Sequence, residues 1–231
     1  MRFGAGVTSA RYEPSGTWTV ATSDGVEQRA RFLIAATGVL SVPFYPDVAG
    51  RDEYKGEQYH TGRWPTTPVD FAGKRVAVIG TGSSGVQVIP SIAEDVASLT
   101  VYQRTAHWCT PLNNAPITPA EQARLRADFD TIRATLNTSM SGFLHVPHDR
   151  ATFDDSEEDR RTFYERMWAS PGFAKLISHY TDLLVDPTAN SAWCEFLSEK
   201  IRSIVADPET AEKLIPKGHR YGEHRPPFVT G

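Results

Sequence analysis

The feature that most constrains the fold of this chain is a glycine-rich turn between a strand-like and a helix-like segment. Residues 80–85 have the spacing Gly-x-Gly-x-x-Gly. They follow the apolar run Arg75–Ile79, which we expect to be a buried strand, and they open a helix-like stretch over about residues 83–93. Residues 99–102 have the composition of another strand. This order predicts a parallel βαβ unit with a right-handed crossover, in which Pro90 bends or shortens the helix.

Each of the three glycines in this turn has a predicted task. Gly80 permits the tight turn, Gly82 lets backbone N–H groups approach a pyrophosphate, and Gly85 lets the helix pack against the strand. The helix N-terminus adds hydrogen-bond donors and partial positive charge. A tight turn without a ligand is the alternative. We expect a dinucleotide site made by Gly80, Thr81, Gly82, Ser83, Ser84, Gly85 and Gln87.

The end of the second strand of such a unit selects between NAD and NADP. An acidic side chain there would hydrogen-bond the ribose 2′-hydroxyl of NAD. This chain instead has Arg104, whose guanidinium pairs bidentately with phosphate, followed by Thr105, a hydroxyl donor. The pair favours the 2′-phosphate of NADP. The alternative interpretation of Arg104 is a solvated charge at a strand end.

Residues 1–42 have the pattern of β structure. Three short segments rich in β-forming residues, Val7–Tyr12, Trp18–Thr22 and residues 26–30, are separated by turn residues. They predict a small antiparallel meander. The continuous apolar run at residues 32–36 is typical of a strand that is buried on both faces.

The rest of the chain divides into four regions. Residues 43–70 are proline-rich and predict a linker between domains, and residues 71–118 hold the βαβ unit. Residues 119–214 predict a helical insertion, and residues 215–231 a loop that leads back to the dinucleotide-binding domain. Within the insertion we expect helices over residues 120–137, 155–169, 172–184 and 192–205, and a short one that begins at residue 207.

Composition and charge argue against several classes of protein. A formal net charge of -4 gives no reason to expect a nucleic-acid or membrane partner, and no apolar run reaches the roughly 18 residues of a membrane span. Cys109 and Cys194 lie in no motif, so we expect reduced thiols in a cytoplasmic protein. The seven histidines form no H-x-x-x-H or H-E-x-x-H pattern, and we expect no metal site.

A second motif narrows the chemistry. Residues 54–65 have the spacing aromatic-x-Gly-x-x-x-His-x-x-x-Trp-Pro. Together with the glycine turn and the Arg-Thr pair, this motif resembles that of the Baeyer–Villiger monooxygenases. By itself the histidine would be a partly buried side chain with one or two hydrogen bonds, and the resemblance makes it a linker histidine that couples cofactor binding to domain motion. The motif positions are Tyr54, where the family has phenylalanine, Gly56, His60, Trp64 and Pro65.

The resemblance also implies a fold and a reaction. The expected fold class is α/β, a three-layer FAD/NAD(P)-binding fold with two dinucleotide-binding domains, incomplete here and with a helical insertion. Residues 1–42 would be the C-terminal-side part of the FAD-binding domain. The expected cofactors are FAD and NADP. The expected activity is a monooxygenase that inserts one oxygen atom from O₂ into a small ketone by way of a flavin peroxide, giving an ester or lactone.

The C-terminal tail carries the catalytic residue that the resemblance implies. Residues 215–227 are similar to the family's Pro-Lys-Gly-x-x-x-Gly-x-Lys-Arg-Pro-Pro segment, which makes Arg225 the active-site arginine. A permanently cationic group favours an anionic peroxide and the adduct that follows. Without the resemblance, Arg225 would be a surface arginine in a polar loop. Where the family has a lysine that contacts the NADP phosphate, this chain has His224, so we expect weaker affinity or preference for NADP.

The sequence leaves alternative functions open. The glycine turn for FAD and the acidic partner of Arg225 are expected upstream and are absent, so we expect a fragment of the family's full length, without turnover of its own. A truncated, inactive NADP-binding remnant is one alternative, and a flavin monooxygenase that oxidises nitrogen or sulfur is another. A flavin disulphide reductase is the least favoured, because Cys109 and Cys194 form no Cys-x-x-Cys pair.

Overall fold

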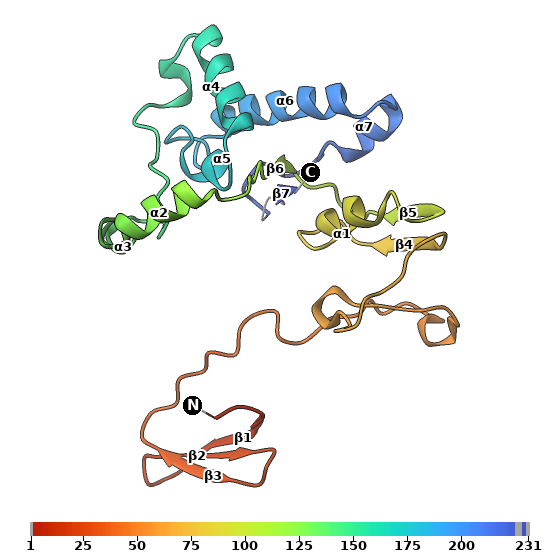
Figure 1. The fold of residues 1–231 in the computed structure, drawn as a ribbon, viewed down its shortest axis with the longest axis vertical. Helices are drawn as coiled ribbons and strands as arrows, with labels where there is room; N and C mark the ends of the chain where they lie inside the picture. The colour runs from red at the N-terminus through yellow and green to blue at the C-terminus, as the bar shows by residue number, and fades with distance from the viewer. Residues whose placement is uncertain (1, 225–227, 230–231) are drawn as a thin grey trace. The chain divides into compact units, whose positions relative to one another are not determined.

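The chain folds into two compact units, Met1–Pro68 and Val69–Gly231, in a computed structural model that describes residues 2–224 and 228–229 (Figure 1). The first unit contains a small antiparallel sheet and an extended segment. The second contains a parallel βαβ unit and a set of helices.

The sheet of the first unit is the predicted meander. Strands β1 (Val7–Tyr12), β2 (Trp18–Thr22) and β3 (Glu27–Ala30) pair in the order β1-β2-β3, all antiparallel. Tyr12 lies opposite Trp18 in the register, and their ring centroids are 5.3 Å apart. Such cross-strand aromatic pairs stabilise a sheet of this size. Two 3₁₀ helices follow in the extended segment, η1 (Arg51–Glu53) and η2 (Thr61–Arg63).

The prediction of a buried strand at residues 32–36 is wrong. These residues form no strand, and the side chains of Phe32 and Ile34 are 77% and 89% exposed. A buried strand needs a hydrogen-bonded neighbour and a covering layer on each face. Within the residues that the structure describes, this run has neither a paired strand nor a covering layer on each face. The sheet of the first unit consists of β1, β2 and β3 only.

The second unit begins with the predicted βαβ unit. Strands β4 (Arg75–Ile79) and β5 (Ser98–Tyr102) are parallel, and α1 (Gly85–Ile92) connects them after the glycine turn. Pro90 lies inside α1, which ends two residues later. The expectation that Arg75–Ile79 is buried is wrong, since Ile79 is 74% exposed and the half-buried residues alternate along the strand. The reason is that α1 contacts β4 and covers one face only.

The helices predicted within residues 119–214 are present, with different boundaries. The capping box of Thr118 with Glu121 starts α2, and Asp128 interrupts the predicted helix at φ −90° and ψ 7°. The predicted helix over 172–184 is wrong beyond one turn, because the Asp182 carboxylate accepts hydrogen bonds from the backbone and hydroxyl of Thr152 and holds its segment in a loop. The elements are α2 (Pro119–Ala127), α3 (Phe129–Thr138), η3 (Thr152–Asp154), α4 (Glu157–Ala169), α5 (Ala174–Ile177), α6 (Pro187–Ile204) and α7 (Pro208–Leu214).

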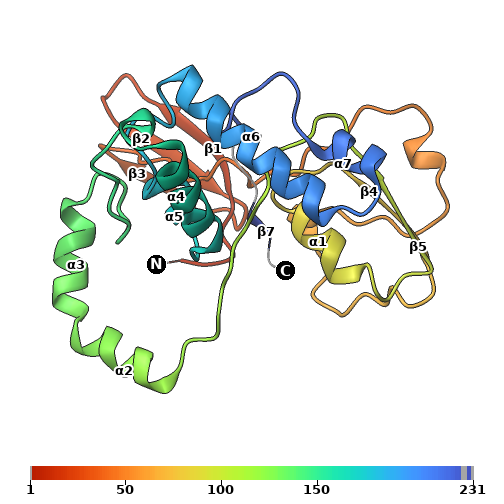
Figure 2. The same cartoon turned by 90° about the horizontal axis from the view of Figure 1, so that it is seen from above.

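Helix α6 starts earlier than predicted because of its N-cap. The Asp186 carboxylate accepts hydrogen bonds from the N–H groups of Thr188 and Ala189, at 2.7 and 2.9 Å. Pro187 occupies the first helical position, where its missing N–H costs nothing. In Figure 2, α6 is a long helix that runs from the region of α4 to that of α7.

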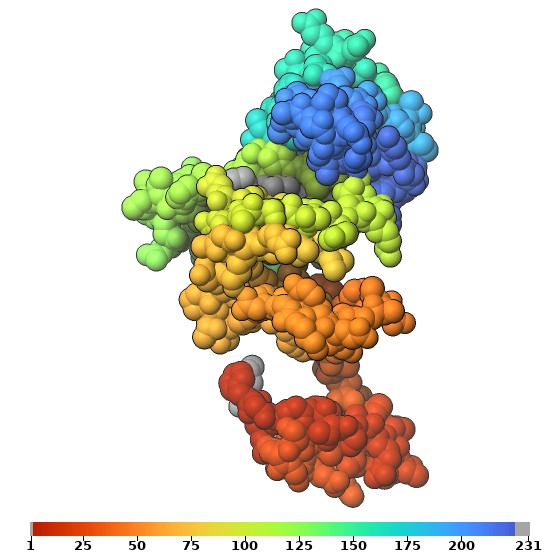
Figure 3. All heavy atoms as spheres, turned by 90° about the vertical axis from the view of Figure 1, so that its right-hand side faces the viewer, coloured from red at the N-terminus to blue at the C-terminus, as the bar shows by residue number. Residues whose placement is uncertain are grey.

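The core of the second unit is aromatic and lies between α4 and α6. Trp193 is fully buried, and its ring stacks on Phe196 with the centroids 5.1 Å apart. In the space-filling view, the atoms of α4 to α7 (cyan to blue) form one packed body (Figure 3). The core consists of Trp108, Phe163, Tyr164, Met167, Tyr180, Leu183, Trp193, Phe196, Leu197, Ile215 and Tyr221. Two members, Trp108 and Tyr221, come from the loops beside the βαβ unit, so this core fixes those loops.

Candidate dinucleotide-binding site

The backbone of the turn at residues 80–85 requires two of its glycines. Gly80 has φ +99°, a conformation that side chains rarely adopt, and its N–H donates to the carbonyl oxygen of Tyr102 at 2.9 Å. A Cβ atom on Gly85 would lie 2.3 Å from the carbonyl oxygen of Gly80. The first turn of α1 therefore packs directly on the end of β4, as the sequence predicts.

Nothing in the described part of the chain requires the third glycine. A Cβ on Gly82 would meet no atom within 4 Å, and its φ is not in the left-handed region. The N–H groups of Gly82, Ser83 and Ser84 have no hydrogen-bond partner among the described residues. Ser84 is the N-cap of α1 and forms no side-chain cap. Open space beside unpaired donors at a helix N-terminus suits a phosphate group, so the turn fits the pyrophosphate of a dinucleotide.

The predicted selectivity residues lie next to this turn. The Thr81 hydroxyl donates to the Thr105 carbonyl oxygen at 3.2 Å, which joins the turn to the segment after β5. Arg104 is exposed and makes no ion pair within the described ranges. The side-chain amide of Gln103 donates to the carbonyl of Lys213 and holds the strand end against α7. Gln87 is exposed on the first turn of α1.

The C-terminal tail contacts the same segment. The Nε2 atom of His219 lies 3.0 Å from the carbonyl oxygen of Ala106, and the indole N–H of Trp108 donates to the carbonyl of His219. His224 is exposed, and its ring centroid is 6.0 Å from that of His107. Two predicted elements, the end of the second strand and the family's phosphate position, are thus brought together. Arg225 lies outside the described residues, so its catalytic role stays a prediction.

Sequence reasoning missed His107 and His219. His107 lies in no motif, and His219 stands at a variable position of the segment at residues 215–227. His219 follows its hydrogen-bond partner Ala106 by 113 residues. The contact is made to the backbone carbonyl of Ala106, so the residue type at position 106 gives no signal of it.

The residues at 54–65 lie in the first unit and are held by local hydrogen bonds. His60 Nδ1 accepts from the N–H of Gly62 at 3.0 Å, so Nε2 carries the proton that it donates to the carbonyl of Phe44 at 3.2 Å. The Arg63 guanidinium donates to the carbonyl of Ser41 at 2.9 Å. The neutral Nε2–H form of His60 therefore ties this segment to the chain that precedes it.

The other positions of the same motif have local explanations. A Cβ on Gly56 would lie 2.3 Å from the Tyr54 hydroxyl, so a larger residue there would displace the exposed tyrosine ring from its present position. The rings of Trp64 and Tyr59 have centroids 5.8 Å apart. Pro65 follows Trp64, whose φ of −61° and ψ of 139° are those favoured before a proline. The structure thus shows a segment held by local contacts; its part as a linker between domains and in cofactor binding stays a prediction.

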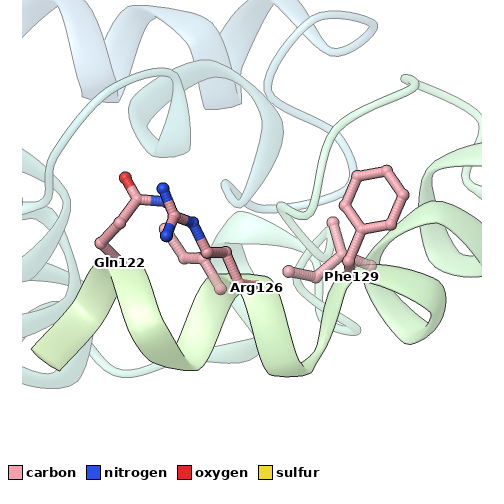
Figure 4. A pocket seen from close by; sticks show the side chains of 5 residues that line it. Gln122, Arg126 and Phe129 are labelled. Carbon is pink, nitrogen blue, oxygen red and sulfur yellow. The ribbon is translucent and has the colours of Figure 1, made fainter.

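A hollow of about 430 Å³ on α2 and α3 lies apart from the site in sequence and shares no residue with it (Figure 4). No group of histidine, cysteine or acidic side chains in the described part of the chain is arranged to hold a metal ion. Within the same residues, no helix is both long and apolar enough to cross a membrane. The hollow is lined by Gln122, Leu125, Arg126, Phe129 and Ile132.

Known proteins with similar sequences and structures bear directly on this site. Residues 5–186 match the family described as pyridine nucleotide-disulphide oxidoreductase. The chain is 42% identical over 236 residues to 2-oxo-Delta(3)-4,5,5-trimethylcyclopentenylacetyl-CoA monooxygenase of Pseudomonas putida, covering 99% of this chain and 43% of that protein. It is 37% identical over 218 residues to a Baeyer-Villiger monooxygenase of Pseudooceanicola batsensis, covering 94% of this chain and 40% of the relative.

A solved structure extends the likeness to three dimensions. The crystal structure of OTEMO in complex with FAD and NADP superimposes with a TM-score of 0.95 at 42% identity, covering 99% of this chain and 44% of that one. The chain thus spans less than half the length of the relatives it matches. The βαβ unit, the glycine turn and the similarity over nearly all of this sequence lead to one assignment: the chain belongs to the pyridine nucleotide-disulphide oxidoreductase family, and the relatives that it matches over part of their length include Baeyer–Villiger monooxygenases.

Proposed function

We propose that this chain is the NADP-binding part of an FAD- and NADPH-dependent monooxygenase that inserts one oxygen atom into a ketone. The overall reaction converts ketone, O₂, NADPH and a proton into an ester or lactone, NADP⁺ and water. The proposal rests on the family assignment and on the relatives' names, which describe monooxygenases. The single observation that carries it is the glycine turn, where Gly82 leaves open space beside three unpaired N–H donors.

The residues of the second unit have distinct parts in this proposal. The N–H groups of Gly82, Ser83 and Ser84 receive the pyrophosphate of NADP, and the α1 N-terminus favours its negative charge. The Arg104 guanidinium, with the Thr105 hydroxyl, receives the 2′-phosphate. Bound NADPH supplies a hydride. The hydrogen bond from Thr81 to Thr105 keeps the two phosphate-binding segments in register.

FAD, when bound, supplies the centre that reacts with O₂. Gly-x-Gly-x-x-Gly occurs once in this sequence, at the turn assigned to NADP. The described residues therefore offer FAD no glycine turn, and we assign none of them to it. We propose Arg225 as the active-site cation on the resemblance of its segment, because an arginine side chain keeps its charge in any protein environment.

We also propose a cytoplasmic location and a partner set of a small ketone and O₂, without nucleic acid. Cys109 and Cys194 are unpaired thiols in the structure, as suits a reducing compartment. Burial raises the pKa of each thiol to about 11, so both are neutral and unreactive at pH 7.

Calorimetric titration of the purified chain with NADP⁺ and NAD⁺ tests the proposal. The wild type should prefer NADP⁺, and Arg104→Gln should lose roughly ten- to a hundredfold in NADP⁺ affinity while NAD⁺ affinity stays the same, because a charge-assisted bidentate contact contributes about 1.5–3 kcal/mol. Arg133→Gln, at an exposed arginine on α3, is the matched control. Equal affinity of the wild type for both nucleotides, or binding of neither, would contradict the proposal.

A further inference from the structure

Three histidine rings gather where the tail meets the segment after β5. The ring centroids of His219 and His224 are 4.5 Å apart, and each lies 6.0 Å from the centroid of His107. The hydrogen bond between His219 and the carbonyl of Ala106 anchors the group one residue beyond Thr105. The three rings, called the histidine cluster below, therefore lie beside the segment proposed to receive the 2′-phosphate.

Two rings of the cluster have a buried nitrogen without a partner. Because the Ala106 carbonyl accepts from Nε2 of His219, the Nδ1 atom of that ring is unprotonated, and it is buried without a hydrogen bond. The Nδ1 atom of His107 is also buried, and like that of His219 it has no hydrogen-bond partner among the described residues. A proton added to either nitrogen would be an uncompensated buried charge, which costs free energy. Burial and the neighbouring rings accordingly lower the pKa of His107 and of His219.

The charged groups around the cluster do not neutralise it. The Glu223 carboxylate, which is ion-paired with the Nε atom of Arg220 at 2.7 Å, acts to raise the pKa of His219, but burial and the two neighbouring rings outweigh it. The backbone N–H of Cys109 donates to the carbonyl of His107, and the Cys109 thiol is neutral because burial raises its pKa to about 11. Arg104 lies three positions before His107 in the sequence. A bound phosphate would thus be the main source of compensating negative charge among the described surroundings.

We propose that His107, His219 and His224 act as one proton-sensitive unit that adjusts recognition of the NADP 2′-phosphate, so that the preference for NADP over NAD increases as the pH falls. The inference rests on the proposed NADP site and deepens it. His224 reaches the phosphate. His107 and His219 are positioning residues, which hold the tail in place and share the proton with His224.

The direction of the effect follows from linkage. Three rings within 6.0 Å of one another resist a second positive charge, so the cluster takes up about one proton as the pH falls. A bound 2′-phosphate stabilises that proton, and binding of NADP⁺ must then be accompanied by proton uptake. NAD⁺ lacks the 2′-phosphate and should bind without proton uptake. The cluster lies within about a Debye length of Thr105, so the attraction is not screened away.

The test is calorimetric titration of the chain with NADP⁺ and NAD⁺ from pH 5.5 to 8.5, in buffers of different ionisation enthalpy. We expect the ratio of NADP⁺ to NAD⁺ affinity to rise about five- to tenfold from pH 8 to pH 6, with net proton uptake for NADP⁺ only. His224→Lys should bind NADP⁺ with a permanent charge and show a flat ratio. The wild type and His224→Lys bind the same ligand. Subtracting the pH dependence of one from that of the other therefore removes the contribution of the 2′-phosphate itself, which ionises with a pKa of about 6.

Further variants separate titration from folding. His219→Gln keeps an N–H donor for the Ala106 carbonyl but cannot titrate, and we expect it to lose at least half of the pH dependence. His145→Gln, at a histidine outside the cluster, should behave as the wild type. A pH-independent ratio in the wild type, or the same pH dependence in His224→Lys, would overturn the inference and leave the NADP site standing. Failure of every variant to bind NADP⁺ would overturn both.

Discussion

Replacing Gly85 by alanine should destabilise the second unit by a steric contact that no rotamer can relieve. The new Cβ would lie 2.3 Å from the carbonyl oxygen of Gly80 and 3.2 Å from its carbonyl carbon. A normal contact between these atom types is about 1 Å longer than the first distance. The Cβ atom is fixed rigidly to the backbone of α1, and its partner is a backbone carbonyl, so α1 must move away from the end of β4. Overpacking of this kind costs about 1–3 kcal/mol.

The effect is measurable as a shift in thermal unfolding. For a domain of this size, 1 kcal/mol corresponds to about 2–4 °C, so calorimetry or circular dichroism should show Gly85→Ala melting roughly 2–12 °C below the wild type. Gly82→Ala is the matched control, because its Cβ meets nothing within 4 Å. It should be as stable as the wild type, or more stable by about 0.4–1 kcal/mol. Its NADP⁺ affinity should nevertheless fall at least about tenfold, since the methyl group occupies the approach to the unpaired N–H groups.

The pair of variants separates a structural glycine from a binding glycine. If Gly85→Ala melted with the wild type, the close packing of α1 on β4 would be wrong. If Gly82→Ala bound NADP⁺ as the wild type does, the open space beside the turn would not be where the pyrophosphate binds. Either result would refute the reasoning used for this site.

Three further predictions concern side chains away from the turn. Burial lowers the pKa of Lys175 to about 8, so between pH 8 and 10.5 the unfolded chain holds the proton of Lys175 more tightly than the folded chain does. The free energy of unfolding, measured by urea titration, should therefore rise by about 2–3 kcal/mol over this range. Lys175→Met should be more stable than the wild type at pH 7 and should lose this rise. Asp186→Ala removes two hydrogen bonds at the start of α6 and should cost about 1–2 kcal/mol in the same assay. His60→Phe removes the acceptor of the Gly62 N–H, and hydrogen exchange at that amide should become at least about tenfold faster. A flat pH profile for the wild type, an unchanged unfolding midpoint for Asp186→Ala or unchanged exchange at Gly62 would contradict these expectations.

Local patterns predicted the local structure well. The meander, the βαβ unit and the order of the helices follow from hydrophobic periodicity and turn residues over short spans. One error arose where an element depends on a distant contact, because the helix expected after Gly172 ended where Asp182 binds Thr152, 30 residues earlier in the chain. The start of α6 is a different case, because Asp186 caps the helix through the N–H groups of Thr188 and Ala189, which is a local signal that the prediction missed. Apolar runs, such as residues 32–36, predict burial but cannot identify the partner that provides it.

The site shows the same division between local and distant information. The glycine turn is a local motif, and its three glycines have the geometry that the spacing predicts. His224 was singled out from the sequence only as a departure from a family pattern. Its significance depends on His107 and His219, which no local pattern marks and which only the hydrogen bond from the tail to Ala106 brings together. A lysine in place of His224 would carry a fixed charge whatever its neighbours. A histidine makes the charge depend on those neighbours, so the substitution and the cluster have to be interpreted together.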